Sequence, residues 1–253
     1  MRAGRGLRFW SAVPLLLPQG LWLRATATRL DPPGGATSGT TGSGAALQLL
    51  VLGDSVVEGI GAPDVAGALG GSFAAALAER FGRQVAWDAI GRSGARVAEV
   101  HGELLPTTPD ATASFVLVSV GLNDVTGLTT LAVWRRRLEA LLEDIMTRNP
   151  GCALMLAGVP PLAYFPAIPQ PLRSVLAGRG RAFDAVSAEV VGRLPRGRFV
   201  ATDFVPDPDD FAPDGYHPGP AGYRGWSRQL AEEAAFALVP HPPDQADGVL
   251  EAH

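Results

Sequence analysis

Val51-Leu52-Gly53-Asp54-Ser55 decides the fold that the sequence predicts. Residues 49–52 form an apolar run with the length of a buried strand, and Gly53 ends that run. A serine directly after such a strand lies at the carboxyl edge of the sheet, where open α/β folds bind their ligands. A serine hydroxyl is a weak nucleophile unless a base, a group that orients the base, and oxyanion donors surround it. The stretch therefore predicts a nucleophile at Ser55, provided that the rest of the chain supplies these partners.

Strand-like and helix-like segments alternate along the rest of the chain. Apolar runs that end in glycine or a turn lie at residues 49–52, 85–90, 115–120, 154–159 and 199–204. Apolar residues at spacings of three and four indicate helices at residues 131–145, 172–194 and 223–234. Strands that alternate with helices imply right-handed crossovers and a parallel sheet with helices on both faces.

Composition limits the classes of function. The chain has 253 residues, 47% of them hydrophobic and 18% charged, and its formal net charge is -4. This length suits one α/β domain, and scattered arginines in an acidic chain exclude an electrostatic footprint for nucleic acid. Cys152 is the only cysteine, which excludes an intrachain disulfide and a cysteine-based zinc cluster.

The two ends of the chain are predicted to lie outside the folded domain. Arg2, Arg5 and Arg8 precede an apolar stretch at residues 9–23, so residues 1–30 resemble a secretory signal or an uncleaved segment anchored in, or lying on, a membrane, with a plain N-terminal extension as the alternative. Export or membrane association is the resulting expectation, and a cytoplasmic location stays open. The remaining predicted boundaries are a flexible linker rich in Pro, Gly, Ser and Thr at residues 31–46, a domain at 47–239 and a tail at 240–253.

Polar side chains follow the predicted strands and precede the last helix. Gly91-Arg92-Ser93-Gly94 follows the second strand, Gly121-Leu122-Asn123-Asp124 follows the third, and Asp214-Gly215-Tyr216-His217 precedes the final helix. His217 has a carboxylate three positions upstream, close enough for Asp214 to reach its ring. The other histidines are poorer candidates for a base: His101 on a predicted helix surface, and His241 and His253 near the end of the chain.

Together these blocks resemble the SGNH (or GDSL) hydrolases, and the resemblance extends from Leu47 to about Val239. Val56 stands where that family usually has leucine, and Ala89 stands where an asparagine often precedes the second block. The resemblance implies a flavodoxin-like three-layer α/β/α sandwich with a five-stranded parallel sheet. It is closer to the small bacterial esterase and lysophospholipase branch than to the long plant-type lipases.

The resemblance also implies roles for individual residues. Ser55, His217 and Asp214 would be nucleophile, base and orienting acid, and the N–H groups of Ser55 and Gly94 would meet the oxyanion together with the Asn123 amide. No metal or cofactor is expected, and the aspartates at residues 203–214 are interpreted as a solvated acidic loop. Asp54 and Asp124 are interpreted as side chains that hold their turns.

Residues 160–169 follow the fourth strand and provide the clue to the substrate. Tyr164, Phe165 and Ile168 in this proline-stiffened loop are candidate substrate-binding residues that would form a wall for an acyl chain, or they simply pack the loop onto the domain. The expected activity is hydrolysis of carboxylic esters with small acyl, lipid or acetylated substrates. Sugar O-deacetylation and a binding module without turnover remain alternatives. No sequence feature indicates a flavin-binding protein.

Overall fold

A six-stranded sheet organises the computed structural model, which describes residues 16–23, 25–26, 28–109, 113–202 and 204–238. The strands are β1 (Ser38–Thr41), β2 (Ala45–Gly53), β3 (Arg83–Gly91), β4 (Phe115–Ser119), β5 (Ala153–Ala157) and β6 (Gly197–Val200). Their order across the sheet is β1-β3-β2-β4-β5-β6. The strands β3, β2, β4, β5 and β6 pair in parallel, whereas β1 pairs antiparallel with β3. The predicted α/β class with a five-stranded parallel sheet is confirmed, with one additional antiparallel edge strand.

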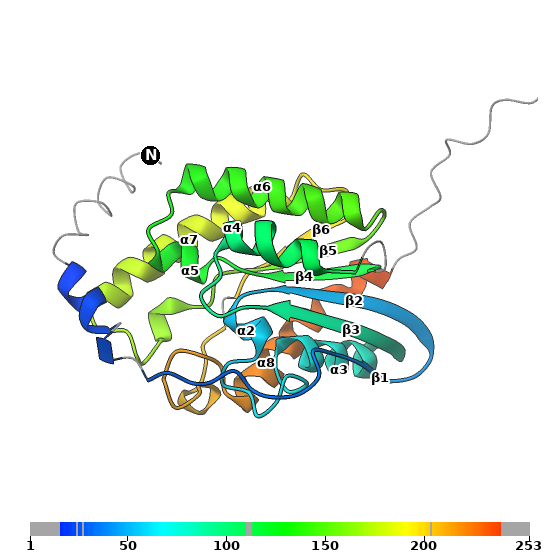
Figure 1. The fold of residues 1–253 in the computed structure, drawn as a ribbon, viewed down its shortest axis with the longest axis horizontal. Coiled ribbons are helices and arrows are strands. Elements are labelled where there is room, and N and C mark those ends of the chain that lie inside the picture. The colour runs from blue at the N-terminus through cyan, green and yellow to red at the C-terminus, as the bar shows by residue number, and fades with distance from the viewer. Residues whose placement is uncertain (1–15, 24, 27, 110–112, 203, 239–253) are drawn as a thin grey trace, which may run out of the picture.

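Helices connect the strands and cover both faces of the sheet (Figure 1). The α-helices are α2 (Ser55–Glu58), α3 (Leu69–Phe81), α4 (Val97–Glu99), α5 (Leu122–Thr126), α6 (Leu131–Arg148), α7 (Leu172–Val191) and α8 (Pro220–Glu232). Shorter turns of other helix types are η1 (Val100–Leu104), η2 (Leu105–Thr107), η3 (Leu162–Tyr164), η4 (Pro208–Asp210) and η5 (Ala234–Leu238).

Strand side chains alternate between two cores because successive residues of a strand point to opposite faces. In β2, Leu50 and Leu52 pack with α6 and α7, while Leu49 and Val51 pack with α3 and α8. Figure 1 shows this division, with α6 and α7 on one side of the sheet and α3 and α8 on the other. All five residues of β4 and all five of β5 are buried, as expected for central strands of a sheet covered on both faces.

The prediction of a flexible linker at residues 31–46 is wrong for its second half. Residues Ser38–Thr41 form β1, and β2 already begins at Ala45. The small polar residues of β1 carry no apolar alternation, so the strand depends on pairing with the exposed edge of β3. Gly39 allows a close approach there, because a Cβ at this position would lie 3.1 Å from the Trp87 ring, a tight contact.

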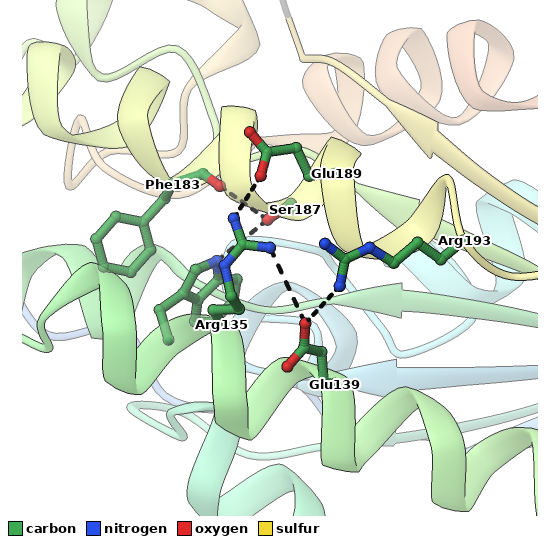
Figure 2. A network of polar contacts seen from close by, with 7 residues as sticks. Arg135, Glu139, Phe183, Ser187, Glu189 and Arg193 are labelled. Atoms are coloured by element: carbon green, nitrogen blue, oxygen red, sulfur yellow. Dashed lines mark hydrogen bonds and ion pairs between the residues drawn. The ribbon is translucent and has the colours of Figure 1, made fainter. Parts of the chain in front are cut away.

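Ion pairs join α6 to α7 at the surface of one helical layer (Figure 2). Arg135 of α6 contacts Glu189 of α7 and, at 3.9 Å, Glu139 one turn further along its own helix. Arg193, just beyond α7, lies 3.2 Å from the same Glu139 carboxylate. Exposed pairs of this kind contribute at most about 1 kcal/mol each, so the buried leucines between the helices are the larger stabilising factor.

Residues 16–23 form a short helix that packs against the domain through Leu16. Among the described residues, no helix combines the length and the apolar character needed to cross a membrane. The first half of the signal-like or anchor-like segment, residues 1–15, and the tail at 240–253 lie outside the described residues, so those two assignments remain predictions.

Candidate active site

Ser55 begins α2 immediately after β2 and lies at the carboxyl edge of the sheet. The turn before it requires glycine, because a Cβ on Gly53 would lie 2.0 Å from the carbonyl oxygen of Ser119 on β4. Asp54 is the N-cap of α2, and its carboxylate accepts a hydrogen bond from the Val56 N–H. The nucleophile candidate is therefore held on a short, well-anchored turn rather than on a free loop.

His217 and Asp214 lie in the loop that precedes α8 and reach Ser55 from the other side. The His217 Nε2 atom lies 3.1 Å from Ser55 Oγ, and the Nδ1 atom lies 2.6 Å from Asp214 Oδ2. The other oxygen of Asp214 accepts hydrogen bonds from the backbone N–H groups of Tyr216 and His217, each at 3.0 Å. The structure thus places hydroxyl, imidazole and carboxylate in one continuous chain of hydrogen bonds.

The Asp214 carboxylate is suited to staying ionised. Burial alone would raise its pKa, but hydrogen bonds from the His217 ring and from the His217 and Tyr216 backbone outweigh burial and lower the pKa. An ionised Asp214 holds the ring with its proton on Nδ1, which leaves Nε2 free to accept the Ser55 proton.

Three groups at the same edge are candidates for binding an oxyanion. The backbone N–H groups of Ser55 and Gly94 have no hydrogen-bond partner among the described residues. Gly94 has a φ of +78°, a conformation that favours glycine, and a side chain there would meet open space. The Asn123 amide donates to the Ala95 carbonyl at 3.0 Å and more weakly to Asp54 Oδ2 at 3.4 Å. That long second contact leaves one N–H of Asn123 able to turn to a substrate oxygen.

Glu58, for which the sequence predicted no role, joins the helix that begins at Ser55 to the turn that carries Gly94. The Glu58 carboxylate accepts a hydrogen bond from the Ser93 backbone N–H at 2.7 Å and another from the Ser93 hydroxyl. Ser93 immediately precedes Gly94, so these bonds fix the turn relative to Ser55 at the opposite end of α2.

A buried network fixes α5, the short helix that carries Asn123. Asp124 accepts hydrogen bonds from the Val97 N–H at 2.8 Å and from the Thr129 hydroxyl at 2.9 Å, which agrees with its predicted structural role. Arg179 of α7 donates to the Val125 carbonyl at 2.9 Å and to the Thr129 carbonyl. Burial lowers the pKa of Arg179 to about 10. No local sequence pattern could have revealed Arg179, because its partners lie 50 and 54 positions away.

Asp54 is buried beside the candidate catalytic groups Ser55 and His217. Burial raises its pKa to about 7, against the opposing effects of the Val56 hydrogen bond and of the nearby His217 ring. The carboxyl group therefore changes its protonation state close to neutral pH, within hydrogen-bonding distance of Asn123.

An apolar hollow with about 530 Å³ of empty space, part of it open to solvent, adjoins His217. It lies between the loops that follow β5 and β6 and the α8 helix, and its lining includes Val56, Leu122, Phe165 and Trp226. Phe165 packs edge-on against Tyr216, with ring centroids 5.2 Å apart, and Tyr216 packs against His217 at 5.2 Å.

Only one of the three predicted wall residues lines this hollow. Phe165 lies in its lining and is 4% exposed. Ile168 is fully buried in the core between the sheet and α7, and Tyr164 is 44% exposed and lies outside the lining. For Ile168 the simpler interpretation, that it packs the loop onto the domain, agrees with the structure.

Of the other three histidines, only His101 is among the described residues. His101 contacts Asp144 of α6, while His241 and His253 fall outside the described residues. Among the described residues, no group of three or more His, Cys, Asp or Glu side chains is placed to hold a metal ion. Asp203, at one end of the acidic loop, is itself outside the described residues.

Comparison with known sequences links the chain to one family. The sequence model of the GDSL-like lipase/acylhydrolase family matches residues 51–224, which include Ser55, Asn123, Asp214 and His217. A GDSL-like esterase of Mycobacterium tuberculosis is 29% identical over 188 residues, which are 70% of this chain and 58% of that protein. The chain therefore spans less than two thirds of the length of this relative.

Comparison with solved structures gives the same fold. A phospholipase A1 from Streptomyces albidoflavus is 17% identical, with a TM-score of 0.55, over 75% of this chain and 100% of that one. An acetyl xylan esterase from Geobacillus stearothermophilus is 21% identical, with a TM-score of 0.51, over 78% of this chain and 99% of that one. At these identities the likeness shows the fold alone.

Proposed function

The chain belongs to the GDSL-like lipase/acylhydrolase family, and on that premise we propose that it hydrolyses carboxylic esters through an acyl-enzyme formed on Ser55. The observation that carries the proposal is the hydrogen-bonded chain from Asp214 through His217 to Ser55 Oγ, with distances of 2.6 and 3.1 Å. Free N–H groups beside the hydroxyl supply the second requirement of acyl transfer, a site for the oxyanion.

Acylation follows from this geometry. Ser55 Oγ attacks the ester carbonyl carbon while His217 Nε2 accepts the hydroxyl proton, and the negative charge moves to the carbonyl oxygen. That oxygen would accept hydrogen bonds from the backbone N–H groups of Ser55 and Gly94 and from the Asn123 side-chain amide. Collapse of the tetrahedral intermediate breaks the ester C–O bond, and His217 returns its proton to the departing alcohol.

Deacylation repeats these steps with water as the nucleophile. His217 Nε2 accepts a proton from the attacking water, and the same donors meet the new oxyanion. The Ser55 oxygen then leaves, takes the proton from His217 and releases the carboxylic acid. The ionised Asp214 stabilises the imidazolium in both halves of the reaction.

The apolar hollow favours an ester whose acyl part is a hydrocarbon chain. Apart from Thr202, Asp210 and His217, its lining consists of aliphatic and aromatic side chains, and the rings of Phe165, Tyr216 and His217 pack in series. A sugar would offer its hydroxyl groups to a surface that has few partners for them. Lipid-like or other acyl esters are therefore proposed ahead of acetylated carbohydrate.

Hydrolysis of a chromogenic butyrate ester by the wild-type chain and by Ser55→Ala tests the proposal. Turnover should fall to the background rate in Ser55→Ala with little change in melting temperature. A serine-directed fluorophosphonate should label the peptide that contains residue 55 in the wild type and not in the variant. Ser174→Ala, which changes an exposed serine of α7, is the matched control and should retain full turnover.

Two results would reject the proposal. Turnover that persists in Ser55→Ala would place the chemistry elsewhere. A wild-type chain that neither hydrolyses the ester nor reacts with the fluorophosphonate would favour a binding module that has lost turnover.

A further inference from the structure

The exposed large apolar side chains of the described residues are not spread evenly over the surface. They are Leu17, Leu21, Trp22, Leu128, Leu131, Tyr164 and Val205. Leu128 lies in the connection from α5 to α6 and Leu131 is the first residue of α6, while Tyr164 and Val205 follow β5 and β6. All four thus lie at the carboxyl edge of the parallel sheet, where Ser55 lies. The opposite edge exposes no large apolar side chain among the described residues.

The other three exposed side chains belong to the helix at residues 16–23, which is docked on this same edge. Gln19 donates a hydrogen bond to the Gln170 carbonyl at 3.0 Å and accepts one from the Leu172 N–H at 3.2 Å, at the start of α7. Leu16 is buried on the inner side, so Leu17, Leu21 and Trp22 form the outer side. In Figure 1 this helix lies at the left, the side toward which the β3 arrow points.

Leu128 is unusual both in its backbone conformation and in its exposure. Its φ of +63° is in the left-handed region, which asparagine or glycine occupies readily and leucine rarely. The side chain is also 37% exposed, so burial only partly offsets the strain. A strained, exposed leucine beside the helix that carries Asn123 suggests selection for an apolar surface at this point.

We propose that this catalytic edge is a lipid-binding face, by which the chain rests on a bilayer of zwitterionic phospholipid with the apolar hollow opening toward the acyl chains. Exposed apolar groups at the same edge as an apolar hollow match the interior of a bilayer rather than water. Exposed charges of both signs lie at this edge, Asp207 and Asp209 after β6 and Arg96 after β3, so no single charge there favours an anionic surface. The inference rests on the proposed function only for the orientation of the hollow.

Flotation of the 253-residue chain with phosphatidylcholine vesicles tests the proposal without any turnover. The chain should float with these vesicles equally well at 0.1 and 0.5 M NaCl, because apolar contacts carry the binding. Leu128→Asn and Val205→Ser should each reduce the vesicle partition coefficient by roughly tenfold. Leu128→Asn should also keep or raise the melting temperature, since asparagine tolerates the left-handed backbone, and both variants should retain turnover of a soluble short-chain ester.

Leu128→Met is the matched control, because it keeps an apolar side chain at the same strained position and should still bind vesicles. Three results would overturn the proposal: no flotation with phosphatidylcholine, flotation only with anionic vesicles and lost in salt, or a self-association in sedimentation that Leu128→Asn abolishes. The last result would assign the face to a second copy. An inactive chain that floats would reject only the esterase function, and an active chain that does not float would reject only the lipid-binding face.

Discussion

The Nε2 atom of His217 lies 3.1 Å from the Oγ atom of Ser55, although the two residues are 162 positions apart in the sequence. The end of β2 and the loop before α8 bring them together at one edge of the sheet. Proton transfer between these atoms needs no rearrangement of the backbone, since the distance is already that of a hydrogen bond.

Asp214→Asn should reduce kcat for a soluble ester by about 10⁴-fold. The asparagine oxygen can still accept the backbone N–H bonds of Tyr216 and His217, so the loop should keep its shape. Its amide, however, would direct N–H groups at Nδ1 and favour the wrong tautomer of the ring. Steady-state kinetics measure the loss. Asp144→Asn, which disrupts the other Asp–His pair at His101, is the matched control and should change kcat little. A kcat within tenfold of wild type in Asp214→Asn would contradict the assigned role.

Glu58→Ala should lower kcat by up to about a hundredfold while KM changes little, because the Gly94 turn loses its tie to the helix of the nucleophile. Glu58 contacts Ser93 rather than the substrate, so it is a positioning residue. Glu58→Gln retains an oxygen that accepts the Ser93 N–H and should recover most of the lost rate.

The control for Glu58→Ala is a variant that changes another carboxylate bound to the same turn, at Arg92. Glu103→Gln weakens the pair between Arg92 and Glu103, whose atoms lie 2.7 Å apart at the surface, and should leave kcat unchanged. Affinity for a boronic acid, which mimics the tetrahedral intermediate, should fall in Glu58→Ala in proportion to kcat. An unchanged affinity together with a general loss of thermal stability would show that Glu58 serves the fold alone.

The parts of this structure that the sequence predicted are those whose signals are local. Strands β2, β3, β4 and β5 each overlap a predicted apolar run that ends at a glycine or turn, and Ser55 and Asn123 lie just after two of these ends. Strand β6, Gly197–Val200, begins before the predicted run at residues 199–204, because its first two residues are glycine and arginine. Strand β1 was not predicted, because its residues pair with β3 but have no alternation of apolar and polar side chains. The roles of Glu58 and Arg179 were not predicted for a related reason. Their hydrogen-bond partners lie 35 to 54 positions away, and no nearby residue identifies those partners.

Asp54→Asn should change how stability depends on pH. In the folded chain the pKa of Asp54 is about 7, above its ordinary value of 3.8, because burial disfavours the charged form. Its contribution to stability is therefore complete below about pH 4 and is lost as the pH rises through about 7. The asparagine does not titrate, so the unfolding free energy of the variant relative to wild type should increase by up to roughly 4 kcal/mol between pH 4 and 8.

Urea denaturation at pH 4, 6 and 8 measures this difference. The pKa values of Asp124 and Asp184 are also raised by burial, but both residues are present in wild type and variant, so their effects cancel in the comparison. The exposed Ser174→Ala, which changes no titratable group, serves as control and should give a difference that does not vary with pH. A difference that stays flat for Asp54→Asn as well would show that this carboxyl group titrates normally.

Phe165→Ser should shift the preference of the enzyme from long to short acyl chains. Phe165 lies in the lining of the hollow, and its ring packs 5.6 Å from Phe211 and 5.2 Å from Tyr216, so a small polar side chain would remove apolar contact area from an acyl chain lying there. The ratio of kcat/KM for an octanoate ester to that for an acetate ester should fall by about tenfold or more. Replacing a buried phenylalanine by a small residue costs about 3–5 kcal/mol of stability, so part of the variant protein could be unfolded. Both substrates are assayed on the same preparation, so a smaller folded fraction lowers both rates equally and does not change their ratio. Phe165→Leu keeps the wall apolar and should preserve the ratio, as should Tyr164→Ser at the exposed neighbouring position outside the lining. An unchanged ratio in Phe165→Ser would mean that the acyl chain binds elsewhere and that Phe165 only packs the loop.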